Sequence, residues 1–166
     1  MSAEPLDVAP LDLAPAPSPG EAEPPPRRET IWLFSKEQHG RLSENFSLRE
    51  FHCGCQERGC HFTLVHAKLV ETLQTLRMML ARPLILTSGF RCRNHNQRVG
   101  GRLRSFHLQG LAADIACHDY GELAELAEAA RRVPAVGAIG SYAAKGYLHL
   151  DLRRRAAGGA IVEWSL

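Results

Sequence analysis

Three residues have the types and the spacing of a catalytic zinc site. His107 and Asp114 lie seven residues apart, and Gly110 between them permits a sharp turn that lets a loop histidine and a strand aspartate meet at one metal ion. Catalytic zinc takes three protein ligands, drawn from histidine and carboxylate, and keeps a further position open for water. A lone histidine is more often a structural residue. His149, from a separate predicted strand, completes the set and makes a zinc site the preferred interpretation.

Two further residues are placed to assist such a site. Residues 147–152 have the pattern of a strand, and because side chains alternate along a strand, His149 and Asp151 face the same side. Arg91 follows a Ser-Gly turn at the end of another predicted strand. Its planar guanidinium suits a carboxylate or carbonyl partner. By position alone, however, Arg91 is better explained as a solvated charge in a turn.

The cysteines form a second group of interest. Cys53, Cys55, Cys60 and His61 fall in a Cys/His-rich loop at residues 52–61, and they are candidates for a small structural zinc site or for a disulfide. Free thiols in a reducing cytosol are an equal alternative, as is a disulfide between Cys92 and one of the loop cysteines. Cys117 lies in apolar surroundings and is expected to be part of the core.

The elements that must position these residues indicate an α+β domain. A leucine stripe from Leu64 to Leu80 predicts a helix that Pro83 ends, and Ser47 with Glu50 has the spacing of a capping box at a short helical turn. Residues 32–46 are expected to be irregular. We predict further helices over residues 94–99 and 120–133, and strands over residues 84–87, 112–116, 138–142, 147–152 and 161–164. The fold class is therefore a small single α+β domain, with helices packed on a mostly antiparallel sheet.

Charge and proline divide the 166-residue chain. Residues 1–26 contain eight of the ten prolines and carry a formal charge of −5, which leaves +7 on the rest of a chain whose total is +2. We expect residues 1–28 to be a disordered Pro/Ala-rich tail and residues 29–166 to be the folded domain. A basic domain suits an anionic partner, either cell wall or nucleic acid. No apolar run is long enough to span a membrane, and the acidic start lacks the pattern of a signal peptide, so the expected location after synthesis is cytoplasmic.

Several spaced motifs, in order, resemble one known family. They are Phe46-Ser47-Leu48-x-Glu50-Phe51, Ser88-Gly89-Phe90-Arg91, Asn94-His95-Asn96, Val99-Gly100-Gly101, Ser105-x-His107-x-x-Gly110-x-Ala112-x-Asp114 and His149-x-Asp151. Together they resemble the VanY-type zinc D-alanyl-D-alanine carboxypeptidases, a family that also holds phage L-alanyl-D-glutamate endopeptidases. The resemblance runs from about residue 45 to residue 164.

The resemblance implies roles for individual residues. His107, Asp114 and His149 would bind Zn²⁺, Arg91 would bind the substrate and stabilise charge on the tetrahedral intermediate, and Ser105 would be a polar substrate contact. The fold would be the one shared with the hedgehog signalling domain. The reaction would be hydrolysis of a peptide bond in the peptidoglycan stem by a monomer acting at the cell wall or periplasm, as phage lysins do. No aromatic series accompanies the basic residues, so nucleic acid is not an expected partner.

The general base departs from the family pattern. Many relatives carry an acidic residue three positions before the last ligand or a histidine two positions before it, where this chain has Gly146 and Tyr147. Asp151 is the best substitute, although it can instead orient a ligand. An alternative register makes His149 the base and Asp151 the ligand, and His95 is a weaker candidate. A non-catalytic zinc module that binds wall fragments or a protein partner is therefore the alternative function.

Overall fold

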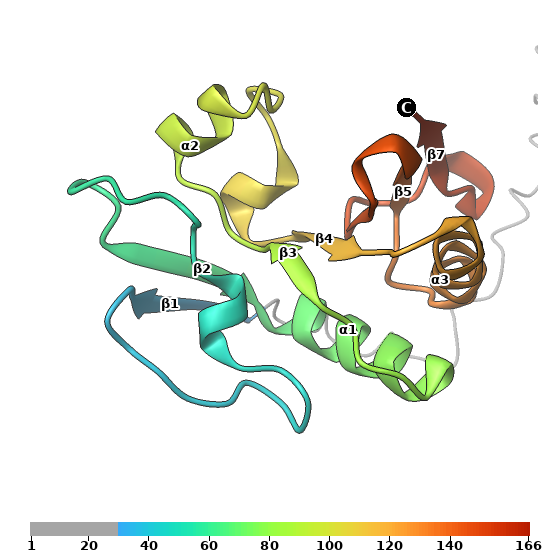
Figure 1. The fold of residues 1–166 in the computed structure, drawn as a ribbon, viewed down its shortest axis with the longest axis horizontal. Coiled ribbons are helices and arrows are strands. Elements are labelled where there is room, and N and C mark those ends of the chain that lie inside the picture. Colours follow the sequence, from blue (N-terminus) through green and yellow to red (C-terminus); the bar gives the residue numbers. More distant parts are fainter. Residues whose placement is uncertain (1–29) are drawn as a thin grey trace, which may run out of the picture.

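The computed structural model describes residues 30–166 as two sheets with three α-helices (Figure 1). The predicted disordered tail, residues 1–28, lies outside the described residues. A two-stranded antiparallel sheet pairs β1 (Ile31–Ser35) with β2 (Phe62–His66). Among the described residues, no helix is long and apolar enough to cross a membrane.

The second sheet has five strands in the order β3-β4-β6-β5-β7. Its strands are β3 (Leu86–Ser88), β4 (Ala112–Ala116), β5 (Ala138–Tyr142), β6 (Tyr147–Asp151) and β7 (Val162–Ser165). All neighbouring pairs are antiparallel except β5 and β7, which run parallel. The predicted α+β class with a mostly antiparallel sheet is confirmed.

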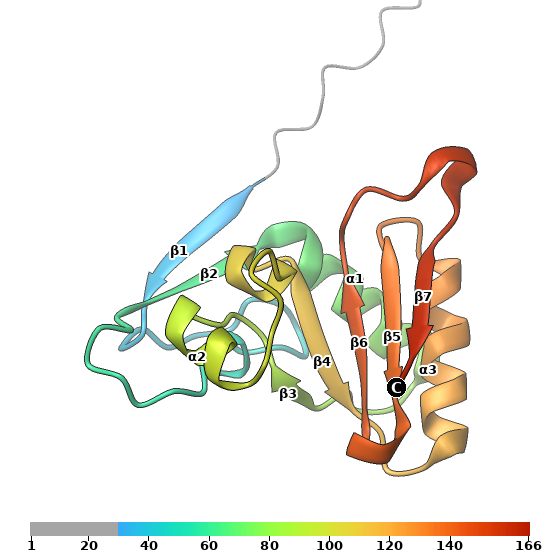
Figure 2. The same ribbon diagram turned by 90° about the horizontal axis from the view of Figure 1, so that it is seen from above.

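Two long helices cover one face of this sheet. They are α1 (Ala67–Leu80) and α3 (Tyr120–Arg132), which lie side by side, while α2 (Arg93–Arg98) lies on the other side of β3 and β4 (Figures 1 and 2). The core between helices and sheet includes Leu73, Leu76, Leu126, Leu148 and Leu150, all fully buried. The polar side chains of β4 and β6 lie on the opposite face of the sheet.

Short 3₁₀ turns complete the fold. They are η1 (Leu48–Phe51), η2 (Phe106–Gln109), η3 (Ala143–Lys145) and η4 (Ala157–Gly159). The capping box predicted before η1 is confirmed, because a carboxylate oxygen of Glu50 accepts the Ser47 backbone N–H at 2.7 Å and the Ser47 hydroxyl at 2.9 Å.

The chain before α1 differs from the sequence prediction. Residues 31–35 were expected to be mostly irregular but form β1, and Leu64 lies in β2 rather than in the leucine-striped helix. The helix begins only after His66, whose ring accepts the Lys68 backbone N–H. Among the described residues, β1 and β2 pair with each other and with no other strand, although some thirty residues separate them, and a local pattern does not reveal such a pairing. Strand β3 also lies slightly later than the predicted residues 84–87.

Gly110 provides a test of how η2 is held against β2. Its φ of +69° is left-handed, and an added Cβ would lie 2.4 Å from the Leu64 carbonyl oxygen. We predict that Gly110→Ala lowers the free energy of unfolding by about 2–5 kcal/mol, of which about 1–2 comes from the backbone conformation and about 1–3 from overpacking. Urea unfolding of the zinc-free protein measures this change.

Gly100→Ala is the matched control for this substitution. Gly100 has nearly the same φ, +70°, but open space around its Cβ position. Gly100→Ala should lower the free energy of unfolding only by the cost of the backbone conformation, about 1–2 kcal/mol. Equal losses in the two variants would contradict close packing of Gly110 against β2.

Candidate metal centre

Two of the three predicted metal ligands lie in one row of paired residues that crosses β4, β6 and β5. Asp114 on β4 pairs with His149 on β6, and His149 pairs with Gly140 on β5. Because side chains alternate, their neighbours Ile115 and Leu148 point into the core on the opposite face. The register between β4 and β6 therefore places an aspartate and a histidine side by side on the polar face.

His107 reaches the same point from the loop before β4. It lies in η2, which ends at Gly110, and the Gly110 carbonyl accepts the His66 backbone N–H at 3.1 Å. The His107 side chain is buried, and its Nδ1 lies 2.6 Å from the Gly89 carbonyl oxygen. The turn after β3 thus orients the His107 ring so that Nε2 of the ring faces the sheet.

The three predicted ligands converge. His107 Nε2 lies 3.1 Å from Asp114 Oδ1 and 3.2 Å from His149 Nδ1, and the latter two atoms are 2.7 Å apart. A tetrahedral zinc ion with ligand distances of about 2.0 Å separates its ligands by about 3.3 Å. The triangle is slightly smaller than that, so a small outward movement of the three atoms accommodates zinc.

The protonation of the His107 and His149 rings bears on whether their nitrogens can bind a metal ion. Since a carbonyl oxygen only accepts hydrogen bonds, the proton of His107 lies on Nδ1 toward Gly89, and Nε2 presents a lone pair. Burial lowers the pKa of His107 and keeps it neutral, although Asp114 opposes the shift. Burial also disfavours charge on His149, but hydrogen bonds with Asp114 and Asp151 outweigh it and raise its pKa.

Asp114 also contacts Arg91, which the sequence placed at the site. Arg91 Nη2 donates to Asp114 Oδ2, and Arg91 Nε donates to the Ser88 hydroxyl at 2.8 Å. Burial raises the pKa of Asp114, but its contacts with the two histidines outweigh burial and hold it well below its ordinary value. Asp114 is therefore an anion with Oδ1 toward the two histidines and Oδ2 toward Arg91.

Asp151 lies on the far side of the His149 ring. It is fully buried, and its Oδ2 lies 3.3 Å from His149 Nε2. Both of its oxygens accept from Arg153, through the backbone N–H and two guanidinium nitrogens at 2.6–3.0 Å. Burial alone would raise the pKa of Asp151, but the Arg153 hydrogen bonds lower it to about 2. This geometry favours the orienting role over the base role predicted first, because the carboxylate has neither access to water nor a free oxygen.

Arg153 and Trp164, which the sequence analysis did not single out, hold Asp151 and His149 in place. The Arg153 guanidinium stacks on the rings of Phe106 and Trp164, with its central carbon 5.0 and 5.6 Å from their centroids. Trp164 also contacts the His149 ring and covers Gly140, where an added Cβ would lie 2.5 Å from the indole. No local motif marks Arg153 or Trp164. Their only signals are the missing side chain at Gly140 and the short i,i+2 spacing of Asp151 and Arg153.

A pocket of about 320 Å³ adjoins the triad at Asp114. Its lining includes Arg91, His95, Lys145 and Tyr147. Burial and the charges of Arg91 and Arg98 lower the pKa of His95, and burial together with the charge of Asp114 raises the pKa of Tyr147 to about 12. Ser105, predicted as a substrate contact, precedes η2 and does not line this pocket.

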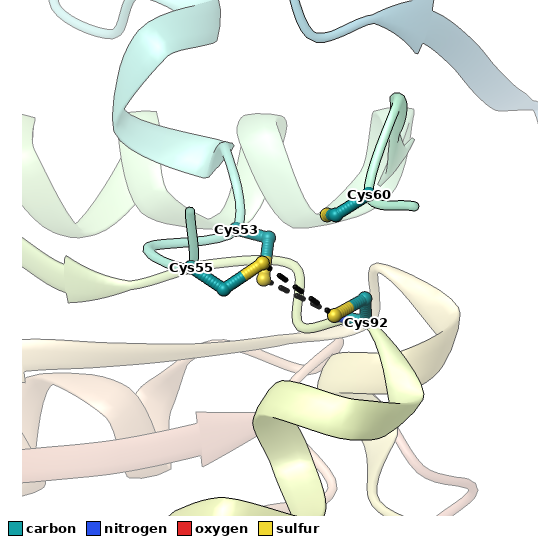
Figure 3. Close-up of side chains that lie close together, drawn as sticks. All are labelled: Cys53, Cys55, Cys60 and Cys92. Atoms are coloured by element: carbon teal, nitrogen blue, oxygen red, sulfur yellow. Dashed lines mark hydrogen bonds between the residues drawn. The ribbon is translucent and has the colours of Figure 1, made fainter. Parts of the chain in front are cut away.

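The cysteines of the loop form a group with a fourth cysteine from outside the loop. Cys53, Cys55 and Cys60 gather with Cys92, which begins α2, and all five cysteines of the chain are free thiols (Figure 3). His61, proposed from its place next to Cys60, is exposed and lies outside the group. Proximity in the sequence does not reveal Cys92, because only the turn after β3 brings it to the loop. Cys117 is buried in the core as expected.

The orienting role of Asp151 predicts a change in zinc affinity. We expect Asp151→Asn to weaken zinc binding at this centre by about 10- to 100-fold, because the amide no longer fixes the His149 ring as a carboxylate does. Equilibrium dialysis against chelator-buffered zinc measures the affinity, with His107→Ala as the reference for zinc bound elsewhere. Glu163→Gln, an exposed carboxylate paired with Arg131, is the control and should bind as wild type. Equal affinity in Asp151→Asn and wild type would contradict the role.

The low pKa of Asp151 also predicts a pH dependence of stability. Its pKa is about 2 in the folded chain against an ordinary 3.8, so its contribution to stability is complete above about pH 4 and is lost as the pH falls toward 2. The difference in unfolding free energy between the zinc-free wild type and Asp151→Asn should narrow over that interval. A difference that stays constant from pH 6 to pH 2 would count against a carboxylate stabilised by Arg153.

Comparison with known proteins agrees with this centre. A search of curated proteins finds no match to the chain. A family profile described as Peptidase M15 matches residues 44–151, about two thirds of the chain, and this range includes the triad, Arg91 and Asp151. The resemblance seen in the sequence is thereby confirmed, and the chain belongs to the peptidase M15 family of zinc metallopeptidases.

Proposed function

We propose that this chain hydrolyses a peptide bond in the stem peptide of peptidoglycan, with one zinc ion bound by His107, Asp114 and His149. The observation that carries the proposal is the convergence of Nε2, Oδ1 and Nδ1 of these residues within 3.2 Å of one another, beside a pocket. Family membership supports zinc and peptide hydrolysis. When bound, zinc supplies a polarised water whose pKa is about 7.

Arg91 is suited to hold the scissile carbonyl. Its Nη2 and Nε are engaged by Asp114 and Ser88, which fix the guanidinium plane. Within residues 30–166, its Nη1 has no hydrogen-bond partner in the protein, so this nitrogen can donate to a substrate oxygen. A donor aimed at the oxyanion of the tetrahedral intermediate contributes about 3–4 kcal/mol to transition-state stabilisation.

His95 is the better candidate for the general base. It lines the pocket that Asp114 and Arg91 share, and its lowered pKa leaves it neutral near pH 7. A neutral imidazole nitrogen can take a proton from the attacking water and return it to the leaving amine. Tyr147, whose pKa of about 12 keeps its hydroxyl protonated, can donate a hydrogen bond from the same wall.

The charge of the pocket supports a substrate with a carboxylate near the scissile bond. Arg91 and Lys145 contribute two positive charges to the lining. Both a terminal D-alanine and an internal D-glutamate of the stem place a carboxylate there, so carboxypeptidase and endopeptidase activity are both compatible with it. The basic charge of the chain beyond its first residues suits a wall polymer, and we propose that a monomer acts at the cell wall or periplasm.

A non-catalytic zinc module is the second candidate. Gly146 and Tyr147 occupy the positions at which many relatives carry the base, and this is the observation that favours it. Such a protein would bind zinc and stem fragments without cleaving them.

Digestion of purified peptidoglycan separates the two. We predict that the wild type releases stem fragments, whose masses identify the bond, that His107→Ala and zinc-free protein release none, and that His95→Gln is slower by about 10²–10⁴-fold. His118→Ala, an exposed histidine, is the control and should match the wild type. Stoichiometric zinc without cleavage of any stem bond would leave the binding module. Full activity in His95→Gln would reject only the base assignment.

A further inference from the structure

We infer that Cys53, Cys55, Cys60 and Cys92 form a second metal site, which binds one structural zinc ion as a tetrathiolate. The four sulfur atoms all lie within 4.8 Å of one another, and those of Cys55 and Cys92 are 3.6 Å apart. Tetrahedral zinc with Zn–S distances of about 2.3 Å separates its sulfurs by about 3.8 Å. The four side chains come from separate points of the loop and from the start of α2, and they point toward a common centre (Figure 3).

As thiolates, these buried side chains would need a cation to balance their charge. Cys53, Cys55 and Cys60 are 2–6% exposed, and Phe90 packs against them. Four thiolates in an apolar shell repel one another and lack solvation, whereas a divalent cation among them compensates both effects. The site is closed by four protein ligands, which is typical of structural rather than catalytic zinc.

Backbone donors already favour the thiolate form that zinc requires. The Cys92 backbone N–H points to the Cys53 sulfur at 3.3 Å, and the His95 backbone N–H points to the Cys92 sulfur at 3.4 Å. The Lys36 ammonium, 2.5 Å from the Cys55 carbonyl oxygen, adds a positive charge beside the loop.

A disulfide accounts for the group less well. A disulfide joins sulfurs in pairs at about 2.05 Å, whereas here four sulfurs share one centre at distances that suit a metal ion. The loop is also fixed to α2 by ordinary contacts, because Glu57 accepts from Asn94 at 2.8 Å and pairs with Arg98 at 2.9 Å. The zinc ion would add a further connection between the cysteine loop and α2.

The consequence concerns the active centre. Cys92 follows Arg91 directly and begins the helix that carries His95. An ion bound at Cys92 therefore anchors the turn that presents both residues to the substrate pocket. The second site does not depend on hydrolysis, so its presence can be tested without any substrate.

Metal counting with cobalt substitution tests this inference. Under reducing conditions the wild type should hold two metal equivalents, and the double variant His107→Ala/Asp114→Ala should keep one. In that double variant cobalt should show the intense thiolate-to-cobalt charge-transfer absorption of a tetrathiolate site. Adding Cys92→Ser should abolish the absorption. Cys117→Ser, which removes the one buried cysteine outside the group, should leave it unchanged.

Thiol reactivity covers the case in which Cys92→Ser does not fold. In the zinc-loaded double variant, the four thiols should be protected from a disulfide reagent until a chelator removes the metal. A double variant that binds no metal under reducing conditions, or a cobalt spectrum without sulfur transitions, would overturn the site. A Cys55–Cys92 disulfide found by mass in the native protein would do the same. None of these outcomes bears on whether His107 is needed for peptidoglycan cleavage.

Discussion

The antiparallel register between β4 and β6 is the constraint on which the rest of the structure depends. It sets Asp114 opposite His149 on one face and Ile115 opposite Leu148 on the other. Because the side-chain period of a strand is two, a slip of one residue would bury His149 and expose Leu148 to the polar face. The same pairing therefore defines both the hydrophobic core and the metal centre.

Buried charge on the polar face follows a repeated pattern in which each carboxylate joins one or two histidines to one arginine. Asp114 lies between His149 and Arg91, and Asp151 lies between His149 and Arg153. Removing one partner from such a group would leave an uncompensated charge in the interior. The two arginines lie in different surroundings. Arg91 lines the pocket beside Asp114, while Arg153 lies between aromatic rings behind the histidine.

The sequence predicted most of the elements around the centre, because residues 112–116, 120–133, 138–142 and 147–152 carry clear periodic patterns. Strand alternation also placed His149 and Asp151 on one face. The sequence did not reveal what depends on contacts distant in the chain. The β1–β2 pairing, the stacking of Trp164 over Gly140 and the approach of Cys92 to the loop each join segments far apart in the sequence. The role of Asp151 could not be decided either, since it depends on Arg153 occupying both carboxylate oxygens.

The burial of the Asp151–Arg153 pair has a consequence for ionic strength. The pairs of Arg131 with Glu163 and of Arg132 with Glu128 are about half exposed, and salt screens such pairs because the Debye length falls from about 8 Å at physiological ionic strength to about 3 Å at 1 M. Asp151 is fully buried beneath Arg153 and its two aromatic rings, where dissolved ions do not reach it. Concentrated salt therefore weakens the ion pairs along α3, while the buried Asp151–Arg153 pair that orients His149 is preserved.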